Sequence, residues 1–80
     1  MKIGIIGYGE IGSSIAKVYE SFEGFDVRVV DPYQNLNDDI DGVEILNICI
    51  PFIDNFVKVV QNYILQANPR YTIVHSTVAP

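Results

Sequence analysis

Three glycines and one acidic residue are spaced as in sites that bind phosphate groups. Gly7, Gly9 and Gly12 form a Gly-x-Gly-x-x-Gly pattern directly after the predicted strand 2–6, and Asp31 follows about twenty residues later. When such a pattern joins a strand to a helix, the helix N-terminus binds a pyrophosphate and the acid binds ribose hydroxyls. The spacing therefore predicts a dinucleotide site. The alternative is that the glycines only form a tight turn.

Each glycine of this pattern has its own expected role. Gly7 permits the tight turn out of the strand, Gly9 removes the Cβ atom that would block a pyrophosphate, and Gly12 lets the helix approach the sheet closely. The unpaired backbone N–H groups of the first helical turn, from Glu10 to Ser13, are expected to donate to the phosphates. An acidic protein can thus bind a polyanion through its backbone.

The acid at the end of the second predicted strand bears on the choice of dinucleotide. Asp31 can accept hydrogen bonds from the hydroxyls of the adenosine ribose, and its charge repels a 2′-phosphate. Residues 32–35 contain neither Arg nor Lys, so NAD is favoured over NADP. Pro32 and Tyr33 are placed to flank the adenine. Their alternative interpretation is a turn proline followed by a surface tyrosine.

The composition argues against several other classes of partner. Five Lys and Arg residues and a net charge of −5 argue against nucleic acid, whose phosphates require clustered cations. The apolar runs are too short to span a bilayer, residues 1–6 show no signal peptide, and no metal site is expected at the acidic residues 38–41. The single cysteine, Cys49, suits a reducing cytosol, so a cytoplasmic location is expected.

Predicted strands and helices alternate along one domain, residues 1–80. The strands cover residues 2–6, 26–31, 43–50 and 71–76. One helix, with apolar residues at helical spacing, runs from the glycine turn to Phe22, and a second begins at an Asp54 cap and ends at Asn68. Residues 32–42 are expected to form a loop with one helical turn.

This alternation predicts an α/β fold: a truncated Rossmann-like domain with a four-stranded parallel sheet and helices on both faces. About twelve residues between the second and third strands leave no room for the outer strand of a full Rossmann half, so the expected order is 2-1-3-4. The alternative places the third strand at the outer edge, beside the second. In the expected order, a topological switch point lies beside the glycine turn, where ligands bind.

Several segments together carry a family resemblance. They are Met-Lys-Ile-Gly-Ile-Ile-Gly-Tyr-Gly-Glu-Ile-Gly at the start, Asp31-Pro32-Tyr33, Ile48-Cys49-Ile50-Pro51 and His75-Ser76-Thr77-Val78-Ala79-Pro80. With these segments the chain resembles the N-terminal NAD-binding domain of the UDP-glucose/GDP-mannose dehydrogenase family, part of the 6-phosphogluconate and 3-hydroxyacid dehydrogenase-like Rossmann group. The resemblance covers essentially the whole chain. It implies oxidation of a sugar C6 alcohol to a carboxylate in two NAD-dependent steps.

The resemblance also implies roles for individual residues. Glu10 and Ile11 would present backbone N–H groups to the pyrophosphate, and Pro51 would line the cofactor cleft. Thr77, with Ser76 beside it, would lie near the nicotinamide as a catalytic residue. The predicted cofactor-binding residues are therefore Gly7, Tyr8, Gly9, Glu10, Ile11, Gly12, Asp31, Pro32, Tyr33, Pro51, Ser76 and Thr77.

The sequence departs from the family pattern at two positions. His75 stands where the family usually has an acid, and it is either an acid–base group or a hydrogen-bonded structural residue. Phe52 stands where the family usually has Thr or a similar small polar residue, and it either packs in the core or narrows the cleft. Cys49, inside an apolar strand, is expected to be a buried and inert thiol.

The family's cysteine nucleophile and lysine have no counterpart in these residues, so the chain alone is expected to be inactive. It is predicted to supply the NAD-binding part of a dehydrogenase acting on a sugar or hydroxyacid alcohol, together with a catalytic domain or partner chain. A homodimer is also expected, because a four-stranded sheet leaves open edges. Two alternatives are a non-catalytic module that senses NAD or AMP, and an S-adenosylmethionine-dependent methyltransferase.

Overall fold

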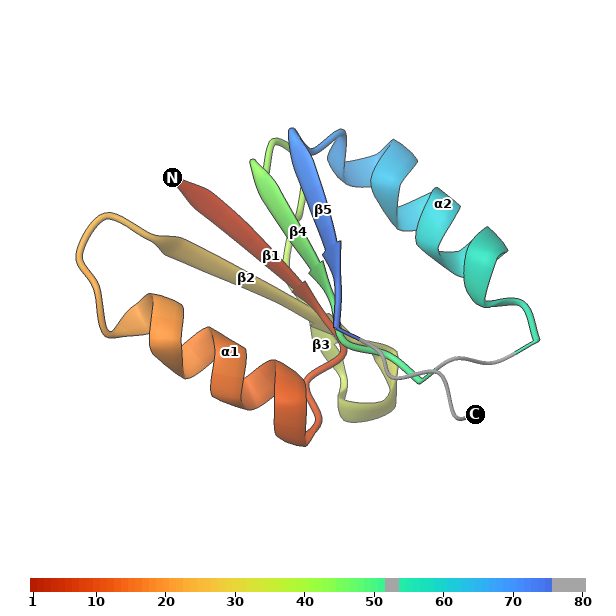
Figure 1. Cartoon of the computed structure of the whole chain (residues 1–80), viewed down its shortest axis with the longest axis horizontal. Coiled ribbons are helices and arrows are strands. Elements are labelled where there is room, and N and C mark those ends of the chain that lie inside the picture. The colour runs from red at the N-terminus through yellow and green to blue at the C-terminus, as the bar shows by residue number, and fades with distance from the viewer. Residues whose placement is uncertain (52–53, 76–80) are drawn as a thin grey trace.

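The computed structural model describes residues 1–51 and 54–75, which form a mixed α/β fold around one sheet (Figure 1). The sheet has five strands in the order β3-β2-β1-β4-β5. In chain order the elements are β1 (Lys2–Ile6), α1 (Glu10–Glu20), β2 (Asp26–Asp31), the short 3-10 helix η1 (Pro32–Gln34), β3 (Leu36–Asn37), β4 (Ile45–Ile48), α2 (Phe56–Ala67) and β5 (Tyr71–Val74). No helix in these described ranges has the length and apolar character needed to cross a membrane.

The predicted four-stranded, wholly parallel sheet is wrong, because β3 adds a fifth strand that runs antiparallel to β2. After η1, Asn35 adopts a left-handed conformation (φ 59°) that reverses the chain. Asp38 extends the pairing, since its carboxylate accepts from the Val29 N–H at 2.9 Å and its own N–H donates to the Val29 carbonyl at 3.0 Å. Part of the expected loop therefore belongs to the sheet.

The other four strands are parallel and follow the order β2-β1-β4-β5. Strand β1 is central: Ile5 is opposite Val29 of β2 on one side and Asn47 of β4 on the other. The outer position beside β2 is occupied by β3, which is where the alternative order would have placed the strand after residue 42. The topological switch point consequently lies between β1 and β4.

Several element boundaries differ from the prediction. Helix α1 ends at Glu20 rather than Phe22, with Ser21 as its C-cap, and β4 covers only four of the eight residues expected to be extended. The N-cap of α2 is Asn55 and not Asp54, and its side chain makes no capping hydrogen bond. The predicted C-terminal end of α2 at Asn68 is confirmed, with a left-handed conformation (φ 49°) at that residue.

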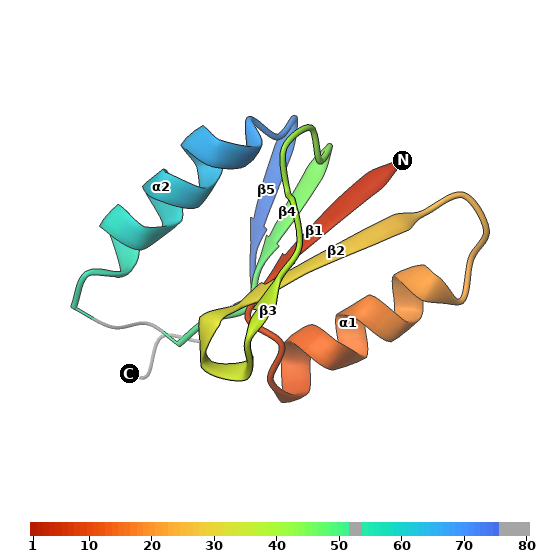
Figure 2. The ribbon, with the colours of Figure 1, turned by 180° about the vertical axis from the view of Figure 1, so that it is seen from behind.

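Two apolar cores lie on opposite faces of the sheet. On one face, Ile3 and Ile5 of β1 pack with Ala16 of α1. On the other face, Ile6 of β1 packs in a larger cluster that includes Leu46 of β4 and Val60 of α2. Figure 2 shows α1 and α2 on either side of the strands. Both faces of the central strands are therefore covered, which explains their nearly continuous apolar sequence.

One buried polar side chain connects the central strands to their surroundings. Asn47, only 1% exposed, donates from Nδ2 to the Gly4 carbonyl of β1 at 3.2 Å and to the Tyr19 hydroxyl of α1 at 3.5 Å. Its Oδ1 lies 2.9 Å from Nε2 of His75, which follows β5. Because Oδ1 only accepts, His75 donates in this pair. Of the two roles considered for His75, the structure shows the hydrogen-bonded one.

Replacing Asn47 by Ala is expected to lower the free energy of unfolding by about 1–3 kcal/mol, because it removes hydrogen bonds to one buried and two partly buried polar groups. Urea denaturation measures the change. Asn62 on the exposed side of α2 provides the matched control. Asn62→Ala is expected to raise stability by no more than about 0.7 kcal/mol, through helix propensity alone. Equal effects of the two substitutions would contradict the assigned role of Asn47.

Candidate functional site

A cleft of about 600 Å³ opens at the carboxyl ends of β1, β2 and β4. It lies beside the switch point between β1 and β4, the place where open α/β sheets bind ligands. Its walls come from the turn after β1, from the end of β2 with η1, from the end of β4 and from one face of α2 with its N-cap. The lining residues are Gly7, Gly9, Asp31, Pro32, Tyr33, Cys49, Ile50, Pro51, Asn55, Val59 and Tyr63.

Two glycines of the pattern are required by the fold itself. Gly7 has a φ of +91°, which side-chain-bearing residues rarely adopt, and a Cβ there would lie 2.8 Å from the Cys49 carbonyl oxygen. A Cβ at Gly12 would overlap the carbonyl oxygen of Gly7. These two residues form the turn and allow α1 to pack directly against the end of β1, as predicted.

Gly9 differs from them because no described residue requires a glycine there. Its φ is −79° and its ψ is −152°, in the extended region, and a Cβ built on it would meet no atom of residues 1–51 and 54–75 within 4 Å. The chain has six glycines, and the other three are explained by positive φ, at Gly24 and Gly42, or by close packing against Leu46, at Gly4. Gly9 therefore leaves open space in the cleft that the fold alone does not account for.

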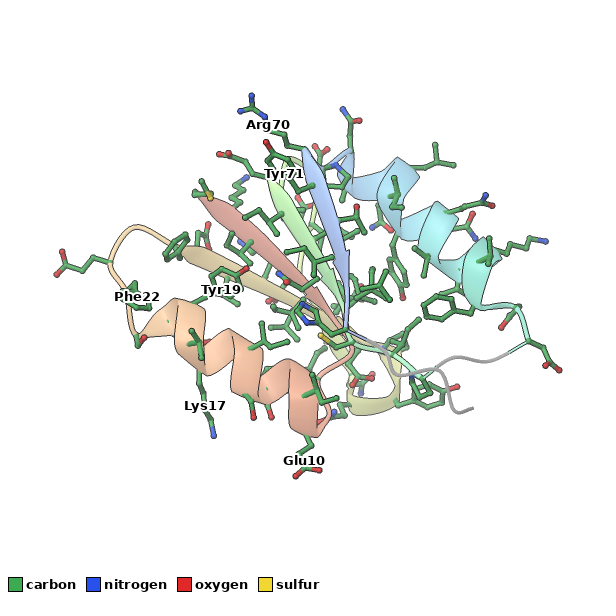
Figure 3. The ribbon with its side chains drawn as sticks, viewed as in Figure 1. Glu10, Lys17, Tyr19, Phe22, Arg70 and Tyr71 are labelled. Carbon is green, nitrogen blue, oxygen red and sulfur yellow. The ribbon has the colours of Figure 1, made fainter. Side chains whose placement is uncertain are left out.

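The N-terminus of α1 adjoins the cleft, since its N-cap is Gly9. Helix geometry leaves the N–H groups of Glu10, Ile11 and Gly12 without partners inside the helix, and no side chain caps them. The expectation that Ser13 is also a free donor is wrong, because its N–H donates to the Gly9 carbonyl at 2.9 Å. Figure 3 shows the Glu10 side chain pointing away from the sheet, so only its backbone faces this turn.

Asp31 lies at the predicted place but already has several partners in the protein. Its carboxylate is buried, with the residue 7% exposed, and accepts from the Tyr8 N–H at 2.8 Å, the Tyr33 N–H at 3.1 Å and Nε2 of Gln34 at 2.9 Å. It is thus the N-cap of η1 as well as a candidate ribose ligand. The sequence signal for this capping role was Asp directly before Pro, which favours a helix start.

The predicted cofactor-binding residues fall into three groups. Those that line the cleft are Gly7, Gly9, Asp31, Pro32, Tyr33 and Pro51. Those in the adjoining turn and helix start, without lining it, are Tyr8, Glu10, Ile11 and Gly12. Ser76, Thr77 and the departure at Phe52 lie outside the described residues, so the predicted catalytic role of Thr77 stays a prediction. Tyr33 is 98% exposed, which suits either of its two interpretations.

Five lining residues were not among the predicted binding residues. Cys49 and Ile50 precede Pro51 at the end of β4, while Asn55, Val59 and Tyr63 belong to the start and first turns of α2. The α2 residues are spaced four apart, which puts them on one helix face. The sequence shows this spacing, but spacing alone does not distinguish a helix face that packs on the sheet from one that lines a cleft.

Cys49 is a partly buried wall of the cleft, and burial raises the pKa of its thiol. The thiolate is the reactive form, so at neutral pH this cysteine holds less of it than a free cysteine does. This state agrees with the predicted inert thiol. In this cleft the Cys49 side chain is therefore an apolar contact surface rather than a nucleophile.

We expect iodoacetamide to alkylate Cys49 more slowly than free cysteine at pH 7. As pH rises, the alkylation rate of Cys49 should reach half of its maximum at a higher pH than the rate of free cysteine does. The raised pKa gives this direction, since fewer thiolates exist at any pH below it. Mass spectrometry of the single modified residue measures the rate. A rate equal to that of free cysteine across this pH range would show that the thiol is neither buried nor perturbed.

Comparisons with known proteins do not place the chain in a group. The family models contain no match to it, and neither the curated proteins nor the solved structures contain a significant match. The resemblance to sugar-nucleotide dehydrogenases thus stays a prediction made from the quoted segments.

Proposed function

We propose that this chain binds the adenosine diphosphate half of NAD in the cleft, as the cofactor-binding part of an NAD-dependent oxidoreductase. The open space at Gly9 carries the proposal, because a glycine that the fold does not need is what a closely approaching phosphate requires. The adjoining N–H groups of α1 supply donors and a favourable dipole for that phosphate. Asp31 supplies the acceptor for the ribose at the opposite wall.

The lining of the cleft also supports a ligand whose adenosine ribose carries no 2′-phosphate. None of the described lining residues is Lys or Arg, so a 2′-phosphate would meet the Asp31 carboxylate without a compensating cation. The nearest arginine along β2, Arg28, is paired with Asp26 at 2.8 Å. Phosphate binding would therefore depend on backbone N–H groups, and NAD is proposed over NADP.

The proposed reaction is oxidation of a sugar or hydroxyacid alcohol, with hydride transfer to the nicotinamide and proton transfer to a base. Such a base is proposed to come from another domain or a partner chain. Exposed apolar residues support a partner: Tyr71, Ile73 and Val74 of β5 are 61%, 42% and 51% exposed. Edge strands of this kind pair with or pack against other chains.

We expect a homodimer in solution, because association would cover these residues of β5. Sedimentation equilibrium at micromolar concentration is the measurement. Ile73→Lys would place a charge on the exposed strand and shift the mass toward the monomer, whereas Lys58→Ala on the exposed side of α2 would leave it unchanged. A monomer mass for the unmodified chain would contradict the dimer.

A non-catalytic module that senses NAD or AMP is the second candidate. It is supported by the described lining, which includes no His, Lys, Arg or Glu, and in which Cys49 has a raised pKa. Such a module needs the glycine turn and Asp31 but no catalytic base. Methyltransferase activity is the third interpretation, and adenosylmethionine belongs in the binding test for that reason.

Gly9→Val should abolish the space for a phosphate while leaving the fold intact. We expect NAD to bind the unmodified chain, and affinity to fall at least about tenfold in the variant, or roughly 1.4 kcal/mol. The free energy of unfolding should fall by no more than about 1 kcal/mol, because Gly9 is the N-cap of α1 and Val is a poorer N-cap than Gly. Calorimetric titration with NAD, NADP, AMP and adenosylmethionine, together with urea denaturation, measures both quantities.

Gly42→Ala is the matched control, because Gly42 precedes β4 at the opposite end of the sheet and has a φ of +80°. This variant should lose about 1–2 kcal/mol of stability yet keep its affinity for NAD. Unchanged NAD affinity in Gly9→Val would exclude this cleft. Adenosylmethionine binding tighter than NAD would favour the methyltransferase, and equal affinities for NAD and AMP would favour the sensing module.

A further inference from the structure

Gln34, the last residue of η1, covers the buried Asp31 carboxylate with its side-chain amide. Nε2 donates to the Tyr8 carbonyl at 2.7 Å and to Oδ2 of Asp31 at 2.9 Å. Both partners are acceptors, so the amide nitrogen and not the amide oxygen must occupy this position. The two hydrogens of the amide are thus used, and one side chain bridges the glycine turn and the end of β2.

The acceptor sites of Asp31 show what this arrangement leaves for a ligand. A carboxylate offers about four lone-pair sites, two on each oxygen. Oδ2 accepts from the Tyr8 N–H and from Gln34, and Oδ1 accepts from the Tyr33 N–H. No other described residue donates to this carboxylate, so one site on Oδ1 stays available. A ribose with two vicinal hydroxyls brings two donors, and only one of them can be accommodated while Gln34 stays in place.

We propose that Gln34 is a displaceable substitute for one ribose hydroxyl, and that it lowers the preference of the cleft for ligands with an intact vicinal diol over ligands with a single hydroxyl. The inference rests on the proposed nucleotide function. Of the three donors to Asp31, two are backbone N–H groups fixed by the glycine turn and by η1, whereas the third belongs to a long side chain of an exposed residue. Gln34 is thus the partner that can leave without disturbing the turn.

Displacement has an energetic consequence. A diol must break two hydrogen bonds of Gln34 before its second hydroxyl reaches Oδ2, so the apparent affinity of the unmodified chain is lowered. A ligand with a single hydroxyl uses the available site on Oδ1 and leaves Gln34 in place. Removing the Gln34 side chain should therefore strengthen binding of the diol and leave the single hydroxyl unaffected.

The test compares AMP with 2′-deoxy-AMP and 3′-deoxy-AMP by calorimetric titration of the unmodified chain and Gln34→Ala. We expect Gln34→Ala to bind AMP about three- to tenfold more tightly, since the net value of the displaced bonds is modest. Affinities for both deoxynucleotides should change less than about twofold. Gln66→Ala, on the exposed side of α2, is the matched control and should change none of them.

A second readout follows the amide itself. In NMR spectra of the unmodified chain, the side-chain NH₂ of Gln34, assigned by its loss in Gln34→Ala, should exchange slowly with water and become fast when AMP is added. Weaker or unchanged AMP binding by Gln34→Ala, or an amide that stays protected with AMP bound, would overturn the inference while leaving nucleotide binding intact. Absence of binding of NAD and AMP by the unmodified chain would overturn the proposed function as well.

Discussion

The close contact between the first turn of α1 and the end of β1 is the constraint on which the rest of the site depends. Any side chain at Gly12 would overlap the Gly7 carbonyl, so the helix starts directly against the strand. This contact places the helix N-terminus beside the switch point between β1 and β4. The space that we propose for a phosphate lies at the bare backbone of Gly9, on the open side of the same turn.

A single carboxylate joins this turn to the opposite wall of the cleft. Asp31 accepts from the Tyr8 N–H in the glycine turn and from the Tyr33 N–H in η1, so the two loops that border the cleft are tied together. The same group is the proposed ribose acceptor. Its replacement would therefore disturb the loops and the proposed binding site together, whereas a change at Gly9 disturbs the fold little, because no atom of the described residues lies within 4 Å of a Cβ built there.

Sequence reasoning located the elements whose signal is local. The bounds of β1 and β2 and the parallel β2-β1-β4-β5 arrangement followed from β-branched runs, glycine spacing and crossover length. Strand β3 was missed because two residues show no periodicity, and its pairing depends on the reversal at Asn35 and on Asp38. The Gln34 bridge was missed since it depends on the tertiary approach of Tyr8 to Asp31. Apolar spacing predicts which face of α2 is turned toward the sheet. It does not predict that Val59 and Tyr63 on this helix also line the cleft.

The most direct measurement is an NMR titration of the isotope-labelled chain with NAD, followed at the backbone amides. Binding as proposed should shift the amides of residues 8–12 and of the cleft wall at Tyr33 and Cys49 most strongly. The amides of Gly24 and Gly42, at the opposite end of the sheet, should stay in place. Shifts concentrated at that opposite end, or no shifts at saturating NAD, would contradict a dinucleotide site at the glycine turn.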